Sequence, residues 1–206
     1  MKRRDLAGLL AMGAIVFLGS GGARADADPI AGKEKTRMCA GCHGIDDYRI
    51  AFPDVYAVPR LGGQVAGYLA KSLKDYRSGA RKHIAMQGMA AALTEQDVAD
   101  IAGYYSSGTL IPAHGAAHVE GSEAIRKKAE ETCAACHGKP GDKPTLPDAP
   151  SLAGQQYEYL AHALKAFRSG TRDNAMMGPL AKTLSDGDIR GLSEYYSSLP
   201  GLSTKY

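Results

Sequence analysis

The sequence predicts an all-α protein made of two tandem domains that repeat one plan. Shifting the chain by 91 residues superimposes its two halves over most of their length. A five-residue cysteine motif occurs once in each half, and the two copies use all four cysteines of the chain. Apolar residues recur at helical spacing in both halves, whereas neither half has a convincing run of alternating β-branched residues.

The first half reads as short helices separated by loops. Asp28 is the predicted N-cap of a helix that carries Cys39 and Cys42, because a proline follows it at the first helical position. A second helix stops at Gly79, a residue suited to a helix C-terminus. Its apolar face is formed by Val65, Tyr68, Leu69, Leu73 and Tyr76. Thr94–Asp97 has the form of a capping box and opens the last helix.

The second half repeats this plan. Ser122 begins a helix that continues through Ala134 and carries the second cysteine motif. The next helix turns four apolar residues inward, namely Tyr159, Leu160, Leu164 and Phe167. Ser185–Asp188 caps the last helix. The repeat therefore divides the chain into an N-terminal domain at 26–109, a linker at 110–120 and a C-terminal domain at 121–206.

Domains of this size made of three or four short helices bury little apolar surface of their own. A cofactor buried in each domain would supply the missing core. The halves differ most in the loop that follows the cysteine motif, which is three residues longer in the first half. A surface loop is the place where such an insertion costs least.

Residues 1–25 are predicted to be a secretory signal that is removed. They combine a basic start, a nearly all-apolar run from Leu6 to Leu18 and the small-x-small sequence Ala23-Arg24-Ala25. A membrane anchor is the alternative, but about thirteen apolar residues fall short of the roughly twenty that span a bilayer. The remaining chain has 21 basic and 21 acidic residues, so its charge gives no support to nucleic-acid binding.

The two cysteine motifs predict covalent attachment of haem c. They read Cys39-Ala40-Gly41-Cys42-His43 and Cys133-Ala134-Ala135-Cys136-His137. Two thiols three positions apart can form thioethers with the vinyl groups of one porphyrin, and the following histidine can bind its iron. A redox disulfide or a four-cysteine zinc site are the alternatives. Neither explains why a histidine directly follows both motifs.

The second axial ligand of each iron is predicted from the register of the repeat. Candidates are Met86, Met89 and His83 in the first half, and Met176 and Met177 in the second. At an offset of 91, only the pair of Met86 and Met177 keeps methionine in both halves, so these two are the expected ligands. The alternative is that they are ordinary core methionines. The remaining histidines are expected at the surface, namely His114, His118 and His162.

In combination, these features resemble dihaem class I cytochromes c of the cytochrome c4 family. The resemblance covers nearly the whole chain after residue 25. It rests on the paired cysteine motifs, the methionines, and four repeated segments: Pro59–Gln64 with Pro150–Gln155, Tyr-Leu, Arg-Ser-Gly and Tyr-Tyr-Ser-Ser. The stretch from Asp46 to Val58, with two tyrosines, is longer than the resemblance leads us to expect.

The resemblance implies two cytochrome c domains related by a pseudo-two-fold axis, each wrapped around a covalently bound haem. It also implies that Pro59 and Pro150 offer their carbonyls to the ligand histidines. It further implies a periplasmic electron carrier at the inner membrane surface that feeds terminal haem-copper oxidases. Expected partners are redox proteins such as an oxidase, a bc1-type complex or a dehydrogenase, with no small-molecule substrate and no nucleic acid.

The leading hypothesis is thus a two-haem electron carrier that is not an enzyme, because no acid/base or nucleophile constellation accompanies the motifs. The alternative is the dihaem cytochrome subunit of a periplasmic dehydrogenase that oxidises sulfide or alcohol. A dihaem peroxidase is disfavoured, since a methionine in each half leaves no open iron for peroxide.

Overall fold

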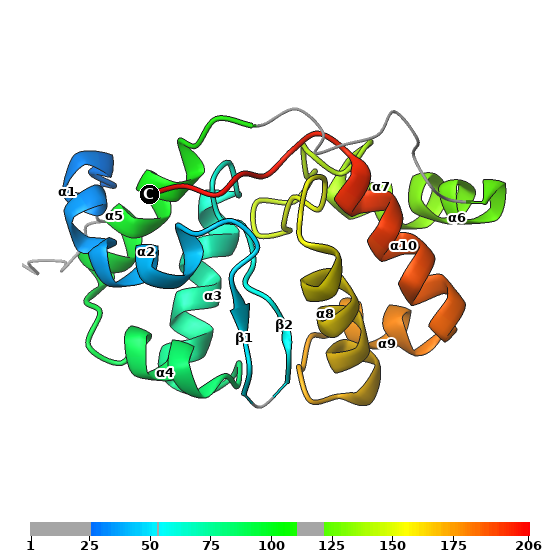
Figure 1. The fold of residues 1–206 in the computed structure, drawn as a ribbon, viewed down its shortest axis with the longest axis horizontal. Coiled ribbons are helices and arrows are strands. Elements are labelled where there is room, and N and C mark those ends of the chain that lie inside the picture. Colours follow the sequence, from blue (N-terminus) through cyan, green and yellow to red (C-terminus); the bar gives the residue numbers. More distant parts are fainter. Residues whose placement is uncertain (1–25, 53, 111–121) are drawn as a thin grey trace, which may run out of the picture.

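The computed structural model describes residues 26–52, 54–110 and 122–206. The predicted signal at 1–25 and nearly all of the predicted linker therefore lie outside the described residues. Within the described part, the chain is mostly helical and its two halves lie side by side, as Figure 1 shows. No helix in this part is long and apolar enough to cross a membrane.

The two halves repeat the same order of helices. The first contains α1 (Pro29–Lys35), α2 (Arg37–His43), β1 (Arg49–Ile50), β2 (Tyr56–Ala57), α3 (Ala66–Ser78), α4 (Ile84–Ala90) and α5 (Glu95–Ser106). The second contains α6 (Glu123–Lys128), a π-helical turn (Ala129–Cys133), α7 (Ala134–His137), α8 (Tyr157–Ser169), α9 (Met177–Lys182) and α10 (Asp186–Ser198).

The predicted helix caps are confirmed. The side chain of Asp28 accepts hydrogen bonds from the first turn of α1. Thr94 and Asp97 form the reciprocal capping box of α5, and Ser185 and Asp188 form the equivalent box of α10. Each box satisfies N–H groups that a helix start otherwise leaves without partners.

Both long central helices end at a glycine in the left-handed conformation, as predicted for the first of them. Gly79 follows α3 and Gly170 follows α8, each with φ of +79°. A residue with a Cβ atom is strained at this φ, so glycine fixes where these helices stop.

The helices that carry the cysteine motifs differ from the prediction. The first is broken at Thr36 into α1 and α2, and the side chain of Thr36 bonds to the carbonyl of Lys33. The second is interrupted by the π-helical turn before α7. The short helices α4 and α9 were not predicted, because six or seven residues carry too little periodicity to be recognised.

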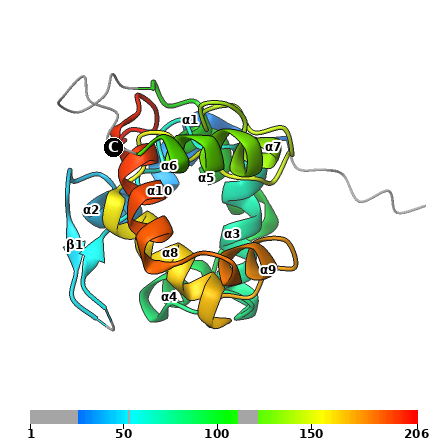
Figure 2. The ribbon, with the colours of Figure 1, turned by 90° about the vertical axis from the view of Figure 1, so that its right-hand side faces the viewer.

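The all-α prediction is confirmed for the fold as a whole, and the described residues add a small β-hairpin that was not predicted. It occupies the longer loop of the first half, where Arg49 pairs with Ala57 and Ile50 with Tyr56 in antiparallel register. Figures 1 and 2 together place it on one outer side of the molecule, next to α8. Strands of two residues are too short for their alternation to be read from the sequence.

Each half has its own core, built on its last helix. Val98, Ile101 and Tyr105 of α5 are almost fully buried, and so are Ile189 and Leu192 of α10. The C-terminal residues then return to the first half, where Ser203 pairs with Gly62 through two backbone hydrogen bonds of 2.9 Å.

Two glutamines join the halves through equivalent contacts. The Gln64 side chain accepts from the Ser151 N–H at 2.8 Å and donates to its carbonyl at 3.1 Å. Gln155, the repeat partner of Gln64, bonds to the N–H and carbonyl of Arg60 at 2.8 and 3.0 Å. Position 151 is the repeat partner of position 60, so this part of the interface obeys the predicted pseudo-two-fold symmetry.

Candidate functional site

A single cavity of about 600 Å³ extends between the two halves. Both cysteine motifs line it, together with apolar side chains such as Leu69 and Leu160. None of the four cysteines forms a disulfide, and all four are partly buried. The two motifs therefore open onto one shared space rather than onto two separate surfaces.

The histidines of the motifs are held by backbone carbonyls. Nδ1 of His43 lies 2.9 Å from the Pro59 carbonyl, and Nδ1 of His137 lies 2.8 Å from the Pro150 carbonyl. These are the two contacts implied by the resemblance. Because a carbonyl can only accept, Nδ1 carries the proton, which leaves Nε2 of each ring free to bind a metal. Burial lowers the pKa of both histidines, which favours this neutral form.

Met86 and Met177 occupy equivalent places at the starts of the short helices. The N–H of Met86 donates to Nδ1 of His83 at 3.3 Å, and the N–H of Met177 donates to Oδ1 of Asn174 at 2.8 Å. Position 174 is the repeat partner of position 83. The local fold thus keeps the register in which the sequence pairs these two methionines.

Met89 and Met176 also line the cavity but are more exposed. Their side chains are 47% and 68% accessible, whereas Met86 and Met177 are half-buried. Lining the cavity does not by itself separate the two pairs of methionines. Burial and repeat register favour Met86 and Met177 as ligands.

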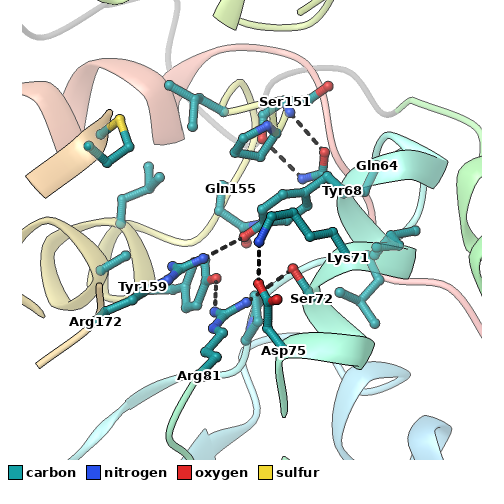
Figure 3. A pocket seen from close by; sticks show the side chains of 18 of the residues that line it. Gln64, Tyr68, Lys71, Ser72, Asp75, Arg81, Ser151, Gln155, Tyr159 and Arg172 are labelled. Atoms are coloured by element: carbon teal, nitrogen blue, oxygen red, sulfur yellow. Dashed lines mark hydrogen bonds and ion pairs between the residues drawn. The ribbon is translucent and has the colours of Figure 1, made fainter. Parts of the chain in front are cut away.

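Two arginines meet two tyrosines where the halves join, as Figure 3 shows. Arg81 donates to the Tyr159 hydroxyl at 2.8 Å, and Arg172 donates to the Tyr68 hydroxyl at 3.2 Å. Each bond crosses from one half to the other. Burial alone would raise the pKa of Tyr68, but the Arg172 and Arg81 guanidiniums lower it below its usual value.

These two arginines were missed from the sequence. Arg81 and Arg172 are repeat partners, as are Tyr68 and Tyr159, so the 91-residue shift contains the signal that could have found them. His162 was expected at the surface and is instead about one third exposed. Its ring stacks on Tyr56 at 4.1 Å between centroids. Two further predicted surface histidines, His114 and His118, lie outside the described residues.

The residues around the cavity fit two haem groups. Within the described residues, neither Arg81 nor Arg172 forms an ion pair with a carboxylate, and the buried Nε of Arg60 has no hydrogen-bond partner. Arg81 and Arg172 therefore face the apolar cavity without a carboxylate partner among the described residues, whereas Arg60 lies 3.8 Å from the Asp47 carboxylate. The propionates of haem are carboxylates, which pair readily with arginine. The zinc alternative does not fit. In the described part of the chain, no group of three or more His, Cys, Asp or Glu side chains is placed to hold a metal.

Comparisons with known proteins agree with this reading. Residues 31–108 match the family described as cytochrome c, and residues 120–195 match that described as cytochrome c oxidase, cbb3-type, subunit III. Cytochrome c4 of Azotobacter vinelandii is 34% identical, over 87% of this chain and 93% of that protein. A thiosulfate dehydrogenase electron acceptor of Stutzerimonas stutzeri is 36% identical, over 78% of each chain. The crystal structure of reduced cytochrome c4 from Pseudomonas stutzeri matches with a TM-score of 0.66 and 32% identity, over 84% of this chain and 99% of that one.

Proposed function

The chain belongs to the family of dihaem cytochromes c4, and from this membership we propose that it shuttles single electrons in the periplasm. It carries two covalently bound haem c groups. When bound, each haem supplies an iron that changes between the ferric and ferrous states by one electron. We expect the donor to be the respiratory chain and the acceptor to be a terminal haem-copper oxidase.

The roles of this chain's residues follow from their positions around the cavity. The thioethers would be formed by Cys39, Cys42, Cys133 and Cys136, and the axial ligands would be His43, Met86, His137 and Met177. A histidine on one face and a methionine on the other favour ferrous iron and raise its potential. If these histidines and methionines held both irons, no iron position would remain for a substrate, and we expect no enzymatic activity of the chain alone.

The observation that supports this proposal most is the shared cavity. Both motifs and both paired methionines line one space in the interior between the halves. Two redox centres that border one cavity can exchange electrons within the molecule. A carrier built in this way can accept an electron on one side and deliver it from the other.

A second candidate is an acceptor that serves one dehydrogenase. The relative named thiosulfate dehydrogenase electron acceptor, at 36% identity, favours this class. This class resembles the predicted subunit of a sulfide- or alcohol-oxidising complex, but the name of the relative refers to thiosulfate rather than to sulfide or alcohol. The donor would then be a dehydrogenase on another chain.

The test compares the two ends of the electron path. The reduced protein is mixed with a haem-copper oxidase preparation, and the oxidised protein with thiosulfate dehydrogenase and thiosulfate, while haem absorbance is followed. Rapid oxidation in the first mixture supports the respiratory carrier. Rapid reduction in the second with no oxidation in the first supports the dedicated acceptor. Failure of both reactions would overturn the proposed function.

A further inference from the structure

The β-hairpin is the asymmetric part of the interface between the halves. We use the term hairpin for the described residues 47–52 and 54–57, which arise from the longer loop of the first half. Its partner surface is the first turns of α8 in the second half, and Figure 1 shows the two side by side. The glutamine contacts described above repeat in both halves, whereas the hairpin has no counterpart strand pair among the described residues of the second half.

Glu158 holds the hairpin through both oxygens of its carboxylate. Oε2 accepts the Ala57 N–H at 2.9 Å, and Oε1 forms an ion pair with Arg49. Arg49 and Ala57 are partners in the register of the hairpin. The Glu158 carboxylate therefore contacts both strands at the same pair of residues. Glu158 lies in the first turn of α8, where the helix dipole favours a negative charge.

Contacts on either side of Glu158 widen this attachment. Asp47 accepts from the Gln156 side chain at 3.0 Å, just before α8 begins. Tyr56 is buried and stacks on His162, one turn beyond Glu158, with an angle of 19° between the rings. Residues four positions apart share one helix face, so the hairpin contacts a continuous strip of α8.

The position equivalent to Glu158 in the first half contacts the loop of the second half in a different way. Shifting by 91 residues places Glu158 on Gly67 of α3. A Cβ atom at Gly67 would lie only 2.2 Å from the Pro147 carbonyl, so the loop of the second half approaches α3 with its backbone. The short loop thus needs a glycine for close contact, while the long loop holds its helix through a carboxylate.

We propose that the hairpin is a strap between the domains, and that Glu158 is a positioning residue that fixes how the two redox sites face each other. The strap is argued from contacts alone, whereas its effect on electron exchange rests on the proposed function. Arg81 and Tyr159, as well as Arg172 and Tyr68, bridge the same interface, so any rocking of the halves would also alter the surroundings of the shared cavity.

The test uses Glu158→Ala in the haem-loaded protein, with Glu95→Ala as the matched control. Glu95 also lies in the first turn of a helix and pairs with Arg77 and Lys74, but all within the first half. Hydrogen exchange by mass spectrometry follows peptides from the hairpin and peptides that contain Arg60 and Ser151. Glu158→Ala should speed exchange in both sets by roughly three- to tenfold, as expected for the loss of one ordinary hydrogen bond and a partly exposed ion pair.

Electron exchange between the haems is measured on the same samples after rapid partial reduction. Its rate constant should fall in Glu158→Ala and stay unchanged in Glu95→Ala. Faster hydrogen exchange confined to the hairpin, or an opened interface with an unchanged rate constant, would overturn the positioning role. If the wild-type protein shows no exchange within the molecule, the proposed function fails, while the hydrogen-exchange data still decide whether the strap exists.

A second variant covers the case in which Glu158→Ala does not fold. Glu158→Gln keeps an oxygen that can accept from Ala57 but loses the charge opposite Arg49. It should give a smaller change in the same direction. High salt should bring the wild-type protein towards this variant, because the ion pair is partly exposed and screened by ions. No change in either variant would refute the proposal.

Discussion

The choice of methionine ligands can be tested by four matched substitutions. Met86→Leu and Met177→Leu each remove a thioether sulfur at a position that the repeat preserves. Met89→Leu and Met176→Leu each remove a thioether sulfur at a position where the repeat does not preserve methionine. Leucine has nearly the volume of methionine, so packing changes little and the loss of sulfur dominates the outcome.

The size of the absorbance change follows from the number of sulfur-bound irons, and the stability cost of the control variants follows from how exposed their methionines are. With one sulfur ligand per iron, losing Met86 or Met177 should halve the weak absorbance near the red end of the spectrum that reports sulfur bound to ferric iron. It should also lower the potential of that haem and open its iron to carbon monoxide. Because Met89 and Met176 are 47% and 68% exposed, their replacement should cost at most about 1 kcal/mol of unfolding free energy.

The assay is absorbance of the ferric protein, followed by redox titration and carbon monoxide binding in the ferrous protein. Met89→Leu serves as the control for Met86→Leu, since the two residues lie on the same short helix. Loss of the red-edge absorbance in Met89→Leu instead of Met86→Leu would refute the register argument for the first half.

Three further outcomes are expected. Cys133→Ala should lower the haem mass retained by the second half and destabilise it, because the cofactor supplies its core; mass spectrometry and calorimetry measure this, and full retention of both haems would contradict it. Asp188→Asn should cost about 1 to 2 kcal/mol of unfolding free energy at neutral pH, because Lys128 first and then the hydrogen bonds from Ser185 hold the pKa of this carboxylate at about 2. That difference should disappear as pH falls from about 4, the unfolded value, to about 2, and a difference that persists at low pH would argue against the ion pair. Arg172→Gln should lower the potential of at least one haem, because a cation near the cavity disfavours ferric iron, whereas the exposed control Arg190→Gln should not change it.

Local signals made much of the fold predictable. The caps at Asp28, Thr94 and Ser185 depend on residues three or fewer positions away, and the structure has all three. The left-handed glycine at Gly79 depends on its own backbone. The contact between the Pro59 carbonyl and the motif histidine was instead predicted from the family resemblance, and the structure contains it.

Long-range contacts explain what could not be predicted. The strands of the hairpin contain two residues each, and Ala57 finds its side-chain partner 101 positions away at Glu158. No periodicity within the loop indicates that partner. The pairing of Arg81 with Tyr159 is similar, because it crosses between the halves over 78 positions. The register of the repeat pairs Arg81 with Arg172 in sequence, but it does not show that Arg81 contacts Tyr159.

Electron exchange between the two haems tests the central claim most directly. The oxidised protein is reduced rapidly and partially, and the redistribution of electrons between the haems is followed by absorbance at several protein concentrations. A dihaem carrier whose redox sites share one cavity predicts a rate constant that is independent of protein concentration. A rate that rises in proportion to protein concentration would contradict the account, since electrons would then pass between molecules instead of within one.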